Sequence, residues 1–504
     1  MGVMAVNLLS LIQLSQNQKC GVLSLLRSVR LVGIITATLL LTGYLALAGV
    51  LPAADDELYY WCWSRSLQWS YYDNPGMSAY LIRLATTLFG HSITAIRLPA
   101  CLTAVVTFAV IAWLSRPRTL LPAILLTPAF TFGAILVTPD TPLLLFWSLY
   151  LAWLVIVHER LTPSSPEAST SIPVGLWLLG GLLLGGGLLG KYTMGLAGPA
   201  GFFSFLLAGR SSWKRWLPGF FAHGVVAAIL ASPIVYFNWQ YDFAPLRFQW
   251  AHAMQSAAQG RGWLSFLEFI GTQTLAFGLL PIVLLPWAWA NLPTLSVSPR
   301  LRVCLAMYAV PMSFFLYKAC RGPLEANWAL VSYLGFWPLA AVWWASRQQH
   351  QTRWFALSTF IVPLSCVVLL AIHAIQPIPL IRPQQDRLTR QAERLTVMAE
   401  IAEAIRHHGE PYPVFTPYYQ NVSLLRYQGL DARQIPGASR ASNFTLTPDR
   451  LSDYPAVYVV HEGLLPYNLT QEFHSPEIVG NFPLLVRGEL ATCYQILLYR
   501  KAHP

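Results

Sequence analysis

The segment LVGIITATLLLTGYLALAGVLP, residues 31–52, contains no charged side chain. A helix crosses the hydrocarbon core of a bilayer with about 20 mainly apolar residues, so this segment is long enough to span it. A few basic residues and Leu-rich stretches precede it, and no small-residue cleavage site clearly follows it. We therefore predict that 31–52 is an uncleaved first transmembrane span and that 1–30 is a cytoplasmic N-terminal segment.

The composition of the chain indicates that the bilayer is its main solvent. Of its 504 residues, 55% are hydrophobic and 11% are charged, whereas soluble domains carry about 25% charged residues. The net charge of +11 does not indicate a nucleic acid partner, because Lys and Arg lie mainly in short loops between apolar runs, where they set membrane topology. The seven cysteines show no CxxC pair and no regular spacing, so neither a disulfide framework nor a zinc site is indicated.

Further apolar runs predict a polytopic α-helical membrane protein with about 11–13 spans. The candidate spans are 31–52, 93–114, 119–137, 142–158, 174–190, 193–209, 217–237, 266–290, 301–317, 328–345 and 354–375.

Basic residues are unevenly distributed over the loops between these runs. With the N-terminus inside, the basic residues of the inner loops are Arg27, Arg30, Arg116, Arg118, Arg160, Arg210, Lys214, Arg215, Arg300, Arg302, Arg347 and Arg353. The opposite loops hold fewer. The positive-inside rule then places the first outer loop 53–92, the loop 238–264 and the C-terminal segment outside.

The C-terminal segment 377–504 differs from the rest of the chain. Residues 388–408 have helical periodicity with charges on one face, and short β-rich runs follow at 413–416, 456–461 and 494–499. We predict a small extracytoplasmic α/β domain.

The first outer loop contains an acidic cluster next to the end of a span, formed by Asp55, Asp56 and Glu57. Ionisable residues near membrane depth are costly and often functional. A carboxylate there could accept a proton from an attacking hydroxyl. The structural alternative is a solvated loop start in which an Asp caps an interfacial helix. The aromatic residues that follow, including Tyr59 and Tyr60, are typical of interfacial anchors.

Later outer segments add cations and polar groups on the same predicted side. Asp140 precedes a span, where Asp is most often an N-cap. Lys191 separates two glycine-rich runs, and it either snorkels to the interface or binds a lipid phosphate. Cations on this side suit a phosphorylated lipid donor, because they would stabilise the leaving phosphate. The other polar residues of these segments are Arg247, His252, Arg261, Lys318, Arg321, Glu325 and Asn327.

A series of motifs closely resembles the signature of a bacterial membrane glycosyltransferase superfamily. That superfamily contains protein O-mannosyltransferases, lipid A aminoarabinose transferases and core galacturonosyltransferases. The resemblance covers roughly residues 30–345. The motifs are DELYYW at 56–61, YYDNPGM at 71–77, RLP at 97–99, TPDTP at 138–142, KY at 191–192, FQ at 248–249 and EANW at 325–328.

The resemblance implies a GT-C fold with a transmembrane catalytic domain over 31–376. It also implies an inverting transfer from a polyprenyl-phosphate-sugar donor to lipid A, another envelope glycolipid or a protein, on the outer face of the bacterial cytoplasmic membrane. It implies catalytic roles for Asp56, Glu57 and Asp140. The expected donor-phosphate residues are Lys191, Arg247, Arg261 and Lys318. The expected substrate contacts are Asp55, Tyr59, Tyr60, Asp73, Glu325 and Asn327.

The chain departs from the superfamily pattern at two places. Asn74-Pro75-Gly76 stands where the family often has His-Pro-Pro, and Asp55 leaves the register of the acidic pair ambiguous by one residue. No cofactor is certain, and a divalent metal ion is the one candidate. The alternative function is a polytopic transporter or lipid flippase, which would favour paired broken helices and internal repeats. No clear two-fold repeat is present in the sequence.

Overall fold

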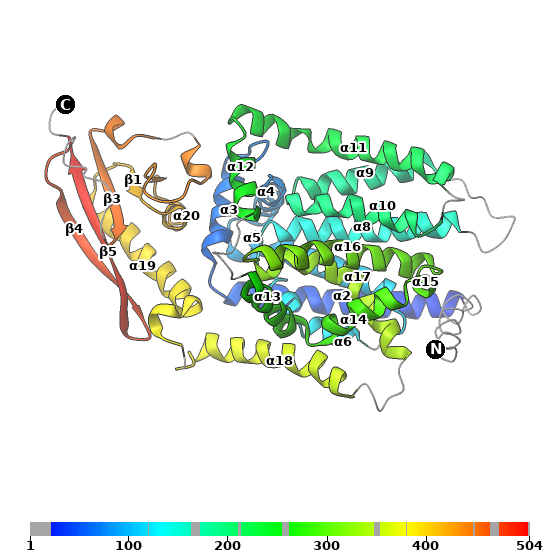
Figure 1. Ribbon diagram of the computed structural model, residues 1–504. Coiled ribbons are helices and arrows are strands. Elements are labelled where there is room, and N and C mark those ends of the chain that lie inside the picture. Colours follow the sequence, from blue (N-terminus) through cyan, green and yellow to red (C-terminus); the bar gives the residue numbers. More distant parts are fainter. Residues whose placement is uncertain are drawn as a thin grey trace.

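The computed structural model describes residues 22–118, 120–162, 172–209, 213–254, 262–346, 353–379, 381–446, 449–463 and 473–501. Figure 1 shows a large helical bundle with a smaller α/β domain seated against one of its ends. The smaller domain, coloured yellow to red, contacts the blue N-terminal helices that follow the first span.

Long apolar helices form the bundle, and shorter helices connect them. The elements are α2 (Val22–Val50), α3 (Asp55–Arg65), α4 (Met77–Phe89), α5 (Ile93–Leu114), α6 (Leu121–Leu125), α7 (Pro128–Thr131), α8 (Asp140–Leu161), α9 (Val174–Leu188), η1 (Tyr192–Leu196), α10 (Ala197–Leu206), α11 (Trp213–Gln240), α12 (Ala244–Met254), α13 (Gly262–Phe277), α14 (Leu280–Ala290), α15 (Leu292–Leu295), α16 (Pro299–Arg321), η3 (Ala326–Ala329), α17 (Leu330–Ala345) and α18 (Arg353–Ile375).

Fewer helices reach the length of a full span than there are apolar runs predicted as spans. Among the described residues, seven helices are long and apolar enough to cross a membrane, or eight if α13 and α14 form one span bent by 101°. The predicted span 119–137 is instead divided into α6 and α7, and each of these helices has a proline near its start. The runs 174–190 and 193–209 form the shorter helices α9 and α10. Apolar composition predicts burial, but prolines and bundle packing decide where each helix ends.

Close helix packing accounts for the glycine-rich sequence of α9. A Cβ atom on Gly181 would lie 2.5 Å from the carbonyl oxygen of His223 on α11, which is closer than side chains approach. A Cβ on Gly219 of α11 would likewise meet the Trp177 ring of α9 at 2.1 Å. Small residues allow such close approach between helices in membranes.

The C-terminal part confirms the predicted small α/β domain. Its five-stranded sheet has the order β2-β1-β3-β5-β4, with parallel pairing around β1 and antiparallel pairing around β5. The predicted helix and all three predicted strand runs are present, whereas α20, β2 and β4 were not predicted. The elements are η4 (Pro383–Gln385), α19 (Arg387–His408), β1 (Val414–Thr416), α20 (Tyr419–Tyr427), β2 (Ala432–Gln434), η5 (Asn443–Thr445), η6 (Leu451–Asp453), β3 (Ala456–Glu462), β4 (Glu477–Val486) and β5 (Glu489–Arg500).

A shared hydrophobic core fixes the C-terminal domain onto the first loop. Leu58 and Trp63 of α3 pack in one cluster with Val422 and Leu425 of α20, and all four side chains are buried. Burial of such side chains contributes about 1.5–3 kcal/mol each. The first loop and the C-terminal domain therefore form one packed unit at the end of the bundle.

Candidate active site

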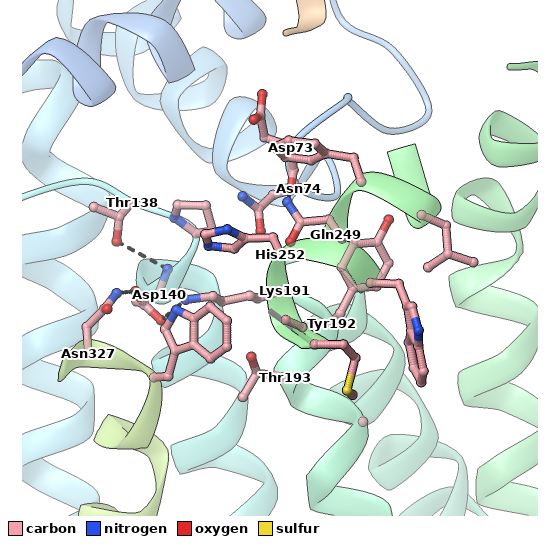
Figure 2. Close-up of a pocket in the computed structure, with 18 of the residues that line it drawn as sticks. Asp73, Asn74, Thr138, Asp140, Lys191, Tyr192, Thr193, Gln249, His252 and Asn327 are labelled. Atoms are coloured by element: carbon pink, nitrogen blue, oxygen red, sulfur yellow. Dashed lines mark hydrogen bonds and ion pairs between the residues drawn. The ribbon is translucent and has the colours of Figure 1, made fainter. Parts of the chain in front are cut away.

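A cavity of about 710 Å³ lies where the bundle meets the C-terminal domain. It is lined by segments from the first loop, from the starts or ends of several bundle helices and from the C-terminal domain. Figure 2 shows part of its wall. The polar and charged lining residues are Asp56, Tyr59, Tyr60, Asp73, Asn74, Thr138, Asp140, Lys191, Tyr192, Thr193, Gln249, His252, Lys318, Asn327, Tyr419 and Arg440.

Asp140, Lys191 and Asn327 form a cluster on one wall of this cavity (Figure 2). The Lys191 Nζ lies 2.7 Å from Asp140 Oδ1, and the Asn327 amide nitrogen donates to Asp140 Oδ2 at 2.6 Å. Asp140 is the first residue of α8 and makes no side-chain cap there, since the N-cap position is Pro139. Asp140 is therefore not an N-cap, and its carboxylate pairs with the Lys191 ammonium at the cavity wall. Phosphate binding and snorkelling both stay predictions for Lys191.

The three acidic residues at the start of α3 point to three different environments. Successive residues of an α-helix are rotated by about 100° relative to one another, so neighbours cannot share one partner. Of the three, only Asp56 lines the cavity.

Glu57 is buried in an ion pair with Arg97 of α5. Its Oε2 lies 2.6 Å from Arg97 Nη2, and Arg97 Nε donates to Oε1 at 2.9 Å. The backbone N–H groups of Ala54 and Val137 also donate to this carboxylate. The remaining Arg97 donors reach carbonyl groups at the end of α2. This geometry anchors α3 to the bundle and gives Glu57 no access to the cavity.

Asp55 also lies outside the cavity lining. Its carboxylate is 2.7 Å from Nη1 of Arg394 and accepts a hydrogen bond from the Gln391 side chain at 2.6 Å. Both partners belong to α19 of the C-terminal domain. Asp55 thus connects the first loop to that domain.

Asp56 lines the cavity and is exposed there. The hydroxyl of Tyr419, at the start of α20, donates to Asp56 Oδ1 at 3.0 Å. Desolvation raises the pKa of the Asp56 carboxyl above its ordinary value, and the charges of Asp55 and Asp73 raise it further. The Tyr419 hydrogen bond and the Arg440 charge act in the opposite direction.

Asp73 connects the first loop to both α12 and the C-terminal domain. Its carboxylate accepts a hydrogen bond from the Tyr59 hydroxyl at 2.6 Å and lies 2.6 Å from Nη1 of Arg440. The Gln249 side-chain amide donates to the Asp73 carbonyl oxygen. Tyr59 and Tyr60 line the same cavity. Of the first-loop residues predicted as substrate contacts, Tyr59, Tyr60 and Asp73 therefore lie at the cavity, whereas Asp55 does not.

The remaining predicted residues fall into three groups. Lys318, near the end of α16, lines the cavity. Arg247 and Glu325 are exposed and lie outside its lining, and the Arg247 guanidinium donates to the Asp242 carbonyl oxygen. Arg261 lies outside the described residues.

Two cavity residues that come from the C-terminal domain, Tyr419 and Arg440, were not predicted from the sequence. They lie far along the chain from the first loop, and no local pattern marks them. His252, one helical turn after Phe248 on α12, was noted only as part of its loop. Its ring contacts the Trp328 ring edge-on, with centroids 5.7 Å apart.

Within the described part of the chain, no group of three or more His, Cys, Asp or Glu side chains is arranged to hold a metal ion. The candidate divalent ion therefore stays a prediction.

Comparison with known proteins confirms the resemblance found in the sequence. Residues 73–237 match the family model described as dolichyl-phosphate-mannose-protein mannosyltransferase. The lipid A galacturonosyltransferase RgtD of Rhizobium johnstonii is 27% identical over 308 residues, which cover 57% of this chain. The match spans 59% of the length of that relative.

Solved structures share the fold. The crystal structures of ArnT from Cupriavidus metallidurans, in the apo state and bound to undecaprenyl phosphate, match with a TM-score of 0.60 over 94% of this chain and 98% of theirs, at 14% and 15% identity. The archaeal oligosaccharyltransferase AglB from Archaeoglobus fulgidus matches with a TM-score of 0.50 over 86% of this chain and 69% of its own, at 12% identity. The chain thus has the predicted GT-C type of fold.

Proposed function

We propose that this protein is a glycosyltransferase that moves a sugar from a polyprenyl-phosphate carrier to an envelope acceptor. One observation carries the proposal. The carboxylate of Asp56 and the ammonium of Lys191, which is paired with Asp140, line the same cavity at the end of the helical bundle. Transfer from a lipid phosphate requires a base for the acceptor and a cation for the departing phosphate.

The donor end of the reaction belongs to Lys191 and Lys318. Both lysines line the cavity, and both come from the bundle, where a lipid carrier would enter. Asp140, which accepts a hydrogen bond from Asn327, pairs with the Lys191 ammonium. ArnT, whose fold this chain shares, has been solved with undecaprenyl phosphate bound, and this supports the same class of donor here. Arg247 is not part of this proposal, because it lies outside the cavity lining.

The acceptor end belongs to Asp56. The acceptor hydroxyl oxygen attacks the anomeric carbon and forms the new glycosidic bond. The bond from that carbon to the phosphate oxygen breaks, and polyprenyl phosphate leaves with the electron pair. The hydroxyl proton passes to Asp56. A single displacement of this kind inverts the anomeric configuration. Glu57 acts only indirectly, by fixing α3 through Arg97.

We propose lipid A as the first acceptor to test, with other envelope glycolipids and proteins as alternatives. The name of the matched relative, a lipid A galacturonosyltransferase, favours lipid A. The transferred group is a hexosyl or pentosyl residue. The acceptor's own lipid chains would reach the cavity from the bilayer.

The proposed location is the bacterial cytoplasmic membrane, with the cavity and the C-terminal domain facing outside. The predicted inner-loop residue Arg160 lies in the last turn of α8, and Arg300 lies in the first turn of α16. The opposite ends of these two helices, at Asp140 and Lys318, reach the cavity. The excess of basic residues at the end away from the cavity supports this orientation.

The purified protein in proteoliposomes, given a labelled polyprenyl-phosphate sugar and lipid A, tests the proposal directly. Mass spectrometry of the acceptor should reveal one added sugar and an equal amount of free polyprenyl phosphate. A lipid flippase, the alternative, would move the labelled donor between leaflets without forming a glycosidic bond. Mass spectrometry of lipid A and envelope glycans from cells with and without the gene would identify the natural acceptor. Identical glycans in both strains, together with no transfer in vitro, would rule the proposal out.

A further inference from the structure

The C-terminal domain contributes side chains directly to the cavity. Tyr419 begins α20, the helix that packs against α3, and Arg440 lies in the loop between β2 and η5. Both residues line the cavity together with residues of the bundle. The C-terminal domain therefore forms part of the cavity wall.

The Tyr419 hydroxyl contacts the carboxylate of Asp56. It donates to Oδ1 at 3.0 Å, and within the described part of the chain Asp56 forms no ion pair. Burial raises the pKa of the Tyr419 phenol, so this hydroxyl stays protonated and acts as the donor. A hydrogen bond to the charged form of a carboxyl favours that form.

The ring of Tyr419 is held from two sides. Its centroid lies 4.6 Å from the Tyr59 ring, and the Arg440 guanidinium carbon lies 4.2 Å from the ring centroid on the cavity side of the domain. Arg440 is in turn paired with Asp73, and the Asn443 backbone N–H donates to the Tyr59 hydroxyl at 2.7 Å. These contacts fix the direction of the hydroxyl toward Asp56.

We propose that Tyr419 is a positioning residue for the transfer reaction, orienting Asp56 and setting the pH range in which it accepts a proton. The inference rests on the proposed function, because it takes Asp56 as the base. It assigns the C-terminal domain a part in catalysis, because the domain supplies a hydrogen bond that favours the ionised form of the base.

The other charged groups around Asp56 act in both directions. Desolvation and the two neighbouring carboxylates raise the pKa of Asp56, whereas Arg440 lowers it, as the Tyr419 hydrogen bond does. Because Asp55 is already paired with Arg394, and Asp73 with Arg440, their charges are partly compensated. The groups concerned are Asp55 on α3, Asp73 in the first loop, Tyr60 on α3, Arg394 on α19 and Arg440 in the C-terminal domain.

The variant Tyr419→Phe tests the proposal, since it removes the hydroxyl and keeps the ring on which Arg440 and Tyr59 pack. Transfer rates would be measured against pH with saturating and with limiting donor. Loss of a hydrogen bond to a charged group should move the acidic limb of the profile about one pH unit upward. The loss of rate should be largest on that limb and smaller on the plateau. Tyr427→Phe, on the same helix but away from the cavity lining, should leave the profile unchanged.

Three outcomes would overturn the inference. An unchanged profile would mean that the hydroxyl does not act on Asp56, and an equal loss of rate at every pH would indicate a purely structural role. Adding Tyr419→Phe to an Asp56→Asn variant should cause no further loss of transfer, and a further loss of tenfold would also contradict the proposal.

A measurement without substrate separates this inference from the proposed function. Infrared spectroscopy of the purified protein would follow the carboxylic acid band that disappears in Asp56→Asn. This band should titrate at higher pH in Tyr419→Phe than in the unmodified protein. If the unmodified protein transfers no sugar, the proposed function fails. If it transfers sugar but the band does not shift, only the role of Tyr419 fails.

Discussion

Replacing Asp56 by Asn should reduce sugar transfer by at least roughly 10²-fold without weakening the fold. A positioned general base typically contributes about 10²–10⁴-fold, and a factor of 10² corresponds to about 2.7 kcal/mol of transition-state stabilisation. Asn keeps the size of the side chain and an oxygen that can accept the Tyr419 hydroxyl proton. It also removes a negative charge from the neighbourhood of Asp55 and Asp73, which relieves repulsion.

The matched variants separate the three neighbouring carboxylates. Asp55→Asn weakens a contact to Arg394 and Gln391 outside the cavity, so the loss of transfer should be smaller than for Asp56→Asn. Steady-state transfer would be assayed on protein whose thermal unfolding matches the unmodified form. If Asp56→Asn keeps near-full activity while Asp55→Asn is folded but inactive, the catalytic carboxylate is Asp55 and the assignment to Asp56 is wrong by one residue.

The pH dependence of the unmodified protein follows from the same residue. Because desolvation raises the pKa of Asp56, its base form is lost as the pH falls through that raised value. Transfer should therefore decline on the acidic side at a higher pH than an exposed carboxylate would cause. Asp56→Asn should lack this acidic limb in whatever activity remains, and retention of the limb would assign it to another group.

The remaining predictions concern stability, donor binding and topology. Glu57→Gln breaks the buried pair with Arg97 and should lower the free energy of unfolding by about 3–5 kcal/mol. The loss would be measured as a lower thermal midpoint, and an unchanged midpoint would contradict an anchoring role. Lys191→Met should raise the donor KM at least about tenfold while the protein stays folded, because the cation paired with Asp140 is lost. Unchanged donor kinetics would show that Lys191 is not part of the donor site. A reporter fused after Pro504 should be active only in its extracytoplasmic form, and activity of a cytoplasmic reporter would reverse the proposed topology.

Much of the architecture was determined by the sequence alone. The preference of an apolar run for the bilayer is a property of the run itself, so 31–52 and the later long runs indicated a membrane bundle without any knowledge of their partners. The helix α19 and the strands β1, β3 and β5 of the C-terminal domain followed from local periodicity. The acidic first loop and Lys191 stood out because charges are costly at membrane depth.

Only the tertiary structure decided how long each helix is and which acidic residue reaches the cavity. Prolines and packing divided the run 119–137, although its hydropathy resembles that of a span. Asp55, Asp56 and Glu57 are chemically similar neighbours, and their roles diverge because a helix turns each toward a different partner. The partner of Asp56 is Tyr419, 363 positions away in the sequence. A contact of that kind depends on how α20 packs against α3, and no local pattern of residues encodes it.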